Sequence, residues 1–358
     1  MRQDVIDALS GRYPASIPSK ESLNHPGIIS HVSGMDVFDN TPEAFELAWR
    51  KLGIDIHVAK PEQNAPRPEV PRGTWVKGNK HYADMGVYPT SMPLEYCPEI
   101  SKSEDDWVFK YDVSSDDFDL SQKLSDLKIA STRFRSNFGN QAVMYHLYYT
   151  TLFMWPVVKF DWEPFMMAAI SQPERFSETL WQPWAHISRK NFEVLAAMDE
   201  DVVFCHDDLT MATGPVFPPE FYEKHIFPQY DYIFEPVVKA GKKLVFVCDG
   251  NMDIFLERLL EFPIDGIMFE NPATPFQRVL DTWGRAGRGF IGGIETNILT
   301  CGTPDEVREH TRSVIEQGRE YPGFIISSCG GLHGNIPMEN MLAYFSARNA
   351  MGISAELK

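Results

Sequence analysis

The sequence has no excess of positive charge, no long apolar run and few cysteines. Lysine and arginine together number 33 against 50 aspartates and glutamates, a net charge of −17. The chain therefore has no basic surplus with which to neutralise the phosphates of a nucleic acid or an anionic membrane surface. It also has no apolar stretch of the roughly 18 residues that a membrane-spanning helix requires. We expect neither a nucleic-acid partner nor a membrane partner.

The cysteines do not form a disulfide framework. Their number is odd, they are widely spaced, and no secretory apolar segment precedes them near the first methionine. This pattern is typical of a protein from a reducing compartment and predicts a cytoplasmic location. The cysteines are Cys97, Cys205, Cys248, Cys301 and Cys329.

Several motifs of well-known enzyme classes are missing. The glycine pairs Gly292-Gly293 and Gly330-Gly331 lack the spacing of a dinucleotide-binding or P-loop phosphate site, and neither a GxSxG nor an HExxH sequence occurs. Any chemistry must therefore come from side chains that the fold brings together.

The carboxyl-terminal half contains five short apolar runs that each end in polar residues. Runs of this length, rich in β-branched and aromatic residues, predict buried strands. They occupy residues 202–205, 244–248, 266–269, 290–294 and 324–328. Each is followed by a group that can do chemistry, from His206-Asp207-Asp208 after the first run to Cys329 after the last.

Helical segments alternate with these strands. Segments 219–240, 252–262 and 275–285 follow the first three strands, and Thr303-Pro304-Asp305-Glu306 is a capping box that predicts the start of a further helix. The alternation predicts an α/β fold, a (β/α)8 TIM barrel with its active site at the carboxyl edge of the sheet. We predict one domain, 1–358, in which 141–358 form the barrel body and 1–140 an irregular, lid-like extension. Within that extension, 60–125 is expected to be β-rich or irregular.

The strand ends offer two kinds of metal ligand. Cys248 and Cys329 both lie beside glycines, and thiolates bind zinc strongly, although a free cysteine is also among the most commonly buried residues. Glu270, Glu295 or His333 could supply a third ligand. The spacing alone leaves both interpretations open.

The aspartates at the strand ends need a charge partner. Asp207, Asp208 and Asp249 would repel one another unless a cation or a proton lies among them. A metal, a cationic substrate or a general-acid role would each satisfy this need, and helix capping or turn formation is the alternative. For Asp249, which precedes Gly250-Asn251, we favour the turn interpretation.

Several segments, taken in order, resemble the uroporphyrinogen decarboxylase superfamily, and within it the cobalamin-dependent methyltransferases. The segments are HDDLTMATGPVFPPEFYEKHIFPQY, KKLVFVCDGN, FIGGIET, GTPDEV and CGGLHGNIPMEN. The resemblance covers roughly residues 140–350. The arginine-rich amino-terminal segment by which the decarboxylases bind substrate carboxylates is not found; Gly11-Arg12-Tyr13-Pro14 is the nearest match.

The resemblance implies a zinc site at Cys248 and Cys329. In these methyltransferases a histidine two residues before the first cysteine is a ligand, and here that position holds Phe246. The third ligand is therefore expected from a neighbouring strand end, with Glu270 or Glu295 as candidates. A carboxylate in the site makes zinc a stronger Lewis acid, which suits a methyl-ether oxygen.

The implied function is transfer of a methyl group from a small donor to the cobalt of a corrinoid protein, plausibly as an O-demethylase. Zinc and cobalamin are the expected cofactors, and the corrinoid protein is the expected partner. We expect Asp208, Glu295 and Asp207 as catalytic residues, and Trp155, Trp162, His206 and Asn271 as substrate-binding residues. The alternative is a cofactor-free decarboxylase of the uroporphyrinogen type.

Overall fold

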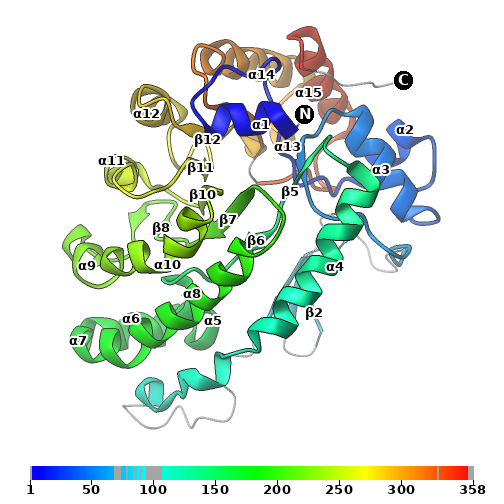
Figure 1. Ribbon diagram of the computed structural model, residues 1–358. Helices are drawn as coiled ribbons and strands as arrows, with labels where there is room; N and C mark the ends of the chain where they lie inside the picture. Colours follow the sequence, from blue (N-terminus) through cyan, green and yellow to red (C-terminus); the bar gives the residue numbers. More distant parts are fainter. Residues whose placement is uncertain are drawn as a thin grey trace.

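The computed structural model describes residues 2–67, 74–77, 80–83, 86–88, 90–93, 107–328 and 330–353. A parallel sheet lies at the centre with helices around it (Figure 1). Cys97 and Cys329 lie outside the described residues. Within those residues, no helix combines the length and the apolar character needed to cross a membrane.

The central sheet is built from the predicted apolar runs. All neighbouring strands are parallel, and the order across the sheet is β13-β12-β11-β10-β7-β6. In that order the strands are Phe324–Ser327, Gly289–Gly293, Gly266–Phe269, Lys243–Cys248, Val202–His206 and Leu147–Tyr148. The predicted α/β fold with a parallel sheet is confirmed.

The amino-terminal segment continues this sheet at its β13 edge. Ser19 forms a parallel bridge with Ile326 of β13, and Lys20 forms one with Ile56 of β1 (Ile56–His57). Strand β1 pairs in turn with β5 (Val143–Met144), which lies two residues before β6. This order of pairing is consistent with a (β/α)8 barrel. The division into a barrel body and a lid-like extension at residue 140 stays a prediction.

Helices follow most strands of the sheet. Thr303 caps α14 (Pro304–Gly318) through the predicted capping box. The segment predicted as one helix over 219–240 is instead two, α9 (Pro219–His225) and α10 (Phe227–Lys239), because a proline at position 228 favours a new helix start. The others in this half are α5 (Met154–Phe160), α6 (Trp162–Ser171), α7 (Pro173–Phe176), α8 (Gln182–Ala196), α11 (Leu256–Leu259), α12 (Phe276–Val279), α13 (Thr296–Cys301) and α15 (Met338–Ala350).

The first part of the chain adds helices and small antiparallel sheets. Its helices are α1 (Arg2–Leu9), α2 (Pro26–Ser33), α3 (Thr41–Lys51) and α4 (Leu120–Phe138). Strands β2 (Thr74–Lys77), β3 (Lys80–Ala83) and β4 (Thr90–Pro93) form an antiparallel sheet within the segment expected to be β-rich or irregular. Farther along, β8 (Thr210–Met211) pairs with β9 (Gly214–Pro215).

The sheet separates two buried apolar clusters. Val245 and Val247 belong to the inner cluster, whereas Leu244, Phe246 and Cys248 belong to the cluster shared with the helices. This is the alternation that a strand imposes on successive side chains. A residue at a strand end therefore faces the inner cluster or the helices according to its place in this alternation.

Helix α1 packs at the amino edge of the sheet. Leu9 lies so close to the first residues of β11 and β12 that a Cβ on Gly266 or Gly289 would come within 2.7 Å or 2.6 Å of its methyl group. A larger residue at either position would force the Leu9 side chain to move. The opposite, carboxyl edge carries the polar residues.

Candidate functional site

The polar ends of β7 and β10 lie side by side at the carboxyl edge of the sheet. His206 is the last residue of β7 and is in register with Val247 of β10. Asp208 and Asp249 follow within two residues of these positions, so all three side chains share one end of the strand pair. Two residues that the sequence predicts at this edge, His206 and Asp208, therefore lie beside Asp249.

His206, Asp208 and Asp249 form a compact cluster. The imidazole Nε2 lies 2.7 Å from Oδ1 of Asp208 and 3.5 Å from Oδ2 of Asp249. The backbone N–H of Asp249 donates to the same Asp208 oxygen at 2.8 Å. One ligand atom from each residue lies within 4.8 Å of the others, a spacing that could hold a metal ion. His206 is buried, whereas the Asp249 side chain is 45% exposed.

A tight turn fixes Asp249 in this cluster. Gly250 has a φ of +80°, and a Cβ at this position would lie 2.7 Å from the carbonyl oxygen of Thr210. Both facts require glycine. Thr210 also donates to the Asp249 carbonyl oxygen at 3.1 Å. Asp249 directly precedes a bend at Gly250, and its side chain lies beside His206.

The pKa values of two carboxyl groups at this edge are raised. Burial, followed by the charge of Asp208, raises the pKa of Asp249 to about 6. Burial, together with the same Asp208 charge, also raises the pKa of Glu270, although a backbone hydrogen bond from Gly250 opposes the rise. Burial lowers the pKa of His206, but the Asp208 hydrogen bond and the surrounding carboxylates outweigh it and raise the pKa overall. Negative charge is therefore concentrated at this edge.

Lys20 is a buried cation whose charge acts on Asp249 at this edge. Its side chain is 2% exposed, its Nζ donates to Ser22 at 2.8 Å, and the ammonium lies 4.5 Å from the centre of the Tyr145 ring. Its charge lowers the pKa of Asp249, but this effect is smaller than those of burial and Asp208.

The side chain of Asp207 binds the backbone at the start of α5. Its carboxylate accepts hydrogen bonds from the backbone N–H groups of Leu152, Phe153 and Met154, and from the hydroxyl of Tyr230 at 2.8 Å. The side chain is completely buried, which raises the pKa of Asp207 to about 6 in spite of these bonds. With both oxygens occupied, Asp207 is a structural anchor in this arrangement, and a catalytic role for it has no support from the geometry.

Cys248 faces the helices. It belongs to the outer apolar cluster with Phe246, its thiol donates to the Asp249 carbonyl oxygen at 3.3 Å, and Thr210 lies 3.8 Å away. Burial raises the pKa of this thiol well above its ordinary value. Among the described residues, the group spaced for a metal does not include Cys248. A zinc site built on this thiol does not fit this arrangement.

A pocket of about 610 Å³ opens at the ends of β11, β12 and β13. Glu270 and Asn271 line it, together with Asn251, Thr296 and Ser328. Asn271 donates to the Gly293 carbonyl oxygen at 2.8 Å and lies 3.4 Å from Oε1 of Glu295. Of the predicted site residues, Glu270 and Asn271 line this pocket, whereas Glu295 does not line it and contacts Asn271 instead. His333, the other ligand candidate, is only partly buried and bonds locally to the Asn335 backbone.

The two tryptophans predicted to bind substrate lie in the helical layer. Trp155 is buried, stacks on Trp184 of α8 with ring centres 5.8 Å apart, and donates to Ser188 at 3.0 Å. Trp162 packs against Phe153 and Phe165. An aromatic side chain that does contact the cluster is that of Tyr149, whose ring meets His206 edge-on with ring centres 4.7 Å apart. Sequence reasoning missed Tyr149, although its place directly after a strand was a signal.

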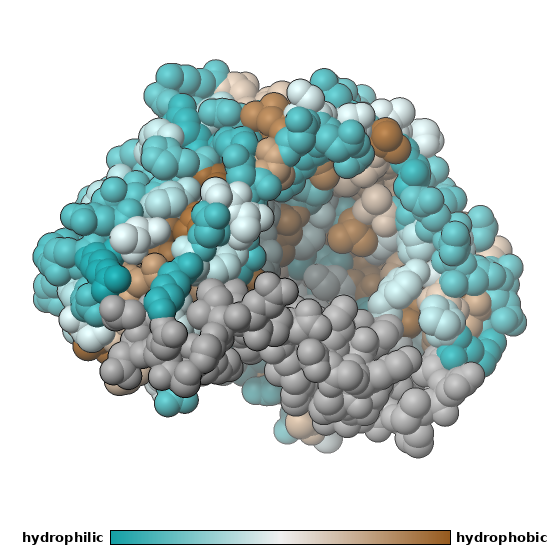
Figure 2. All heavy atoms as spheres, turned by 90° about the horizontal axis from the view of Figure 1, so that it is seen from below, coloured by the Kyte–Doolittle hydropathy of each residue, from teal (hydrophilic) through white to brown (hydrophobic). Residues whose placement is uncertain are grey.

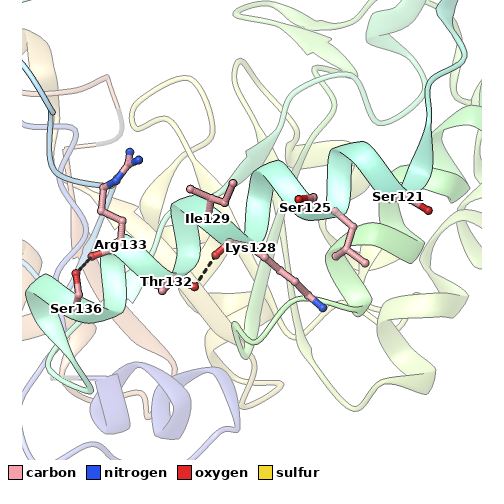
Figure 3. Close-up of a pocket in the computed structure, with 8 residues that line it drawn as sticks. Ser121, Ser125, Lys128, Ile129, Thr132, Arg133 and Ser136 are labelled. Carbon is pink, nitrogen blue, oxygen red and sulfur yellow. Dashed lines mark hydrogen bonds between the residues drawn. The ribbon is translucent and has the colours of Figure 1, made fainter.

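Figures 2 and 3 show concave parts of the surface. Seen from below, the molecule has a central hollow in which apolar side chains gather (Figure 2). The outer face of α4 borders a concave surface lined by Ser125, Lys128 and Ile129, among other residues of that helix (Figure 3). Its lining comes from α4 alone and holds no cluster of histidines and acids. The carboxyl edge of the sheet is therefore the candidate active site.

Comparison with known proteins agrees with this fold. A solved structure described as a methyltransferase from Methanosarcina mazei is similar over 98% of each chain, with a TM-score of 0.65 and 14% sequence identity. No curated protein sequence matches. The family described as uroporphyrinogen decarboxylase (URO-D) matches residues 159–351, more than half of the chain. This matched region contains the candidate cluster, and the protein belongs to the uroporphyrinogen decarboxylase family.

Proposed function

We propose that this protein is a methyltransferase of the uroporphyrinogen decarboxylase superfamily. In this proposal it moves a methyl group from a small donor, plausibly a methyl ether, to the cobalt of a corrinoid protein. The observation that carries the proposal is the acidity of the carboxyl edge, where Asp208 and Asp249 lie beside His206 and Glu270 lies at the end of the neighbouring strand. The similar fold of an archaeal methyltransferase is compatible with it.

The acidic edge weighs against the decarboxylase alternative. A uroporphyrinogen carries several carboxylates, which need cationic partners in a binding site. Here the nearest groups are themselves carboxylates, and the buried cation described at this edge, Lys20, already bonds to Ser22. A neutral methyl donor meets no such repulsion.

The reaction needs a proton for the leaving oxygen. Breaking a methyl–oxygen bond leaves an alkoxide or phenoxide, and a carboxyl group with a raised pKa is a suitable donor. Glu270 lines the pocket, and burial together with the charge of Asp208 raises its pKa. We assign Glu270 the role of proton donor, and Asn271 and Glu295 a role in holding the donor molecule. A reduced corrinoid, when bound through its partner protein, supplies the nucleophile.

Of the two cysteines that the family resemblance implies as zinc ligands, the structure describes only Cys248. Because Cys248 faces the helices, no step of the proposed reaction is routed through a thiolate-bound zinc ion. The groups that act in the proposal are the carboxyl group of Glu270 and the amide of Asn271, which line the pocket, and Glu295, which contacts Asn271.

The test is methylation of cobalt. The purified protein, a Co(I) corrinoid and a panel of methyl ethers, methanol, methylamines and methyl thiols should yield methyl-Co(III), seen as a change in the visible spectrum. Glu270→Gln should slow this change by about 10²-fold or more, the usual contribution of a general acid. If no donor methylates cobalt while a porphyrinogen is decarboxylated, the protein is a decarboxylase.

A further inference from the structure

We infer that His206, Asp208 and Asp249 form a binding site for one divalent transition-metal ion, with one nitrogen and two carboxylate oxygens as ligands. This ligand set contains neither of the two cysteines that the family resemblance implies. It does not depend on the proposed methyl transfer, because metal binding can be measured without turnover.

The donor atoms are already close together. The 2.7 Å and 3.5 Å separations from the imidazole Nε2 to the two carboxylates place three potential ligands around one point. Three protein ligands with an open position form the usual arrangement of a catalytic metal site. An imidazole with carboxylates suits zinc and neighbouring first-row metals.

Asp249 has a free ligand atom. Its carboxylate accepts no hydrogen bond from the described residues, although its neighbours His206 and Asp208 are mostly buried. Its backbone is held at Gly250 and by the N–H bond to Asp208, and its side chain is 45% exposed, so an ion from solvent can reach the carboxylate. A group held in this way beside a second carboxylate is stabilised by a cation.

The charge balance also favours a cation. Ligand oxygens of Asp208 and Asp249 lie within 4.8 Å of each other, and Glu270 brings a third carboxyl group to the neighbouring strand end. His206 and Lys20 are the positive groups that bear on Asp249 in the described chain. A divalent ion would remove the remaining repulsion, and its open position would be available to a donor oxygen as a Lewis-acid site.

The neighbouring groups provide matched controls. Glu270 is also a carboxylate at a strand end, but it lies outside the group whose ligand atoms are within 4.8 Å of one another. Cys248 adjoins Asp249 in sequence, but its thiol faces the helices. Replacing either residue should leave this metal site intact, whereas a site built on Cys248 and Glu270 would lose its ligands.

The experiment is titration of the metal-free full-length protein with Zn²⁺ by calorimetry, followed by Co²⁺ spectroscopy. Asp249→Asn is the principal variant because the side chain is 45% exposed, so the fold should survive. We expect one site per chain, and affinity at least about tenfold weaker in Asp249→Asn and His206→Gln, since loss of even an outer-shell partner has such an effect. Glu270→Gln and Cys248→Ser should bind within about threefold of the unaltered protein.

The spectrum of bound Co²⁺ separates the two ligand sets. A nitrogen and oxygen site should lack the intense near-ultraviolet absorption of a cobalt–thiolate bond. The inference is overturned if the protein binds no Zn²⁺, if Cys248→Ser or Glu270→Gln weakens binding while Asp249→Asn does not, or if the thiolate absorption appears. Cobalt methylation is assayed separately, so its absence with intact zinc binding would refute only the proposed function.

Discussion

His57 should make the protein less stable in mild acid. Its ring is 3% exposed, stacks on Trp49 with ring centres 4.4 Å apart, and meets the edge of Phe138 at the same distance. Burial in this aromatic setting lowers the pKa of His57 from 6.5 to about 4; the Arg50 charge adds to the fall and the hydrogen bond to the Val58 carbonyl opposes it.

The sign follows from the lowered pKa. Above about pH 6.5 the ring is mostly unprotonated in both the folded and the unfolded state, so the free energy of unfolding has its full value with respect to His57. As the pH falls from about 6.5 towards 4, the unfolded chain gains a proton that the folded protein cannot accept. The full shift of 2.5 pKa units corresponds to about 3.4 kcal/mol. Between about pH 7.5 and pH 5, the free energy of unfolding should fall by about 2 kcal/mol from this residue alone.

The assay compares the unaltered protein with His57→Phe. Phenylalanine keeps a ring between Trp49 and Phe138 but cannot be protonated. Urea unfolding at both pH values gives two free-energy losses, and the loss should be about 2 kcal/mol smaller in the variant. Other titrating groups cancel in this comparison. Equal losses in the two proteins would refute the reasoning, because they would show that His57 is protonated equally in the folded and unfolded states.

Three further predictions concern stability. Asp207→Ala leaves several buried N–H groups without an acceptor and should lower the free energy of unfolding by about 3–5 kcal/mol in urea titrations; a loss below about 1 kcal/mol would contradict its anchoring role. Thr303→Ala removes the cap of α14 and should cost about 1 kcal/mol, whereas Ser313→Ala on the same helix should change thermal stability little. Arg348→Met leaves Glu21 as a buried charge without its 3.7 Å partner and should cost about 3 kcal/mol or more; adding Glu21→Gln should recover part of that loss, and a purely additive double variant would contradict the pairing.

The fold followed from the sequence because its signals are local. The runs at 244–248 and 266–269 became β10 and β11 within one residue, since short apolar runs between turn residues have few alternatives. The helix over 219–240 was predicted in one piece, although the proline at 228 favoured a break. The capping box at Thr303 was recognised because its two hydrogen bonds join residues only three positions apart.

The site was harder to predict because it depends on which side chains face which way. His206 and Asp208 were named as candidates, but their partner Asp249 was interpreted as a turn residue. Asp207 looked equivalent to Asp208 in sequence, yet three backbone N–H groups from a segment more than fifty residues earlier occupy it. Such long-range bonds have no signature in the local sequence.

The parity of β10 decides which residue can act at the carboxyl edge. Val245 and Val247 face the inner cluster, so Cys248 must face the helices, and the next residue, Asp249, returns to the inner side. Because neighbouring residues of a regular strand point to opposite faces, the thiol at 248 and the carboxylate at 249 cannot both be ligands of one site on the inner side. Phe246 obeys the same rule: its ring packs 5.7 Å from that of Tyr230 on the outer side. Because position 246 shares the parity of 248, both positions of the family's ligand pair face the helices here, and Asp249 is the residue of β10's end that remains available to a ligand.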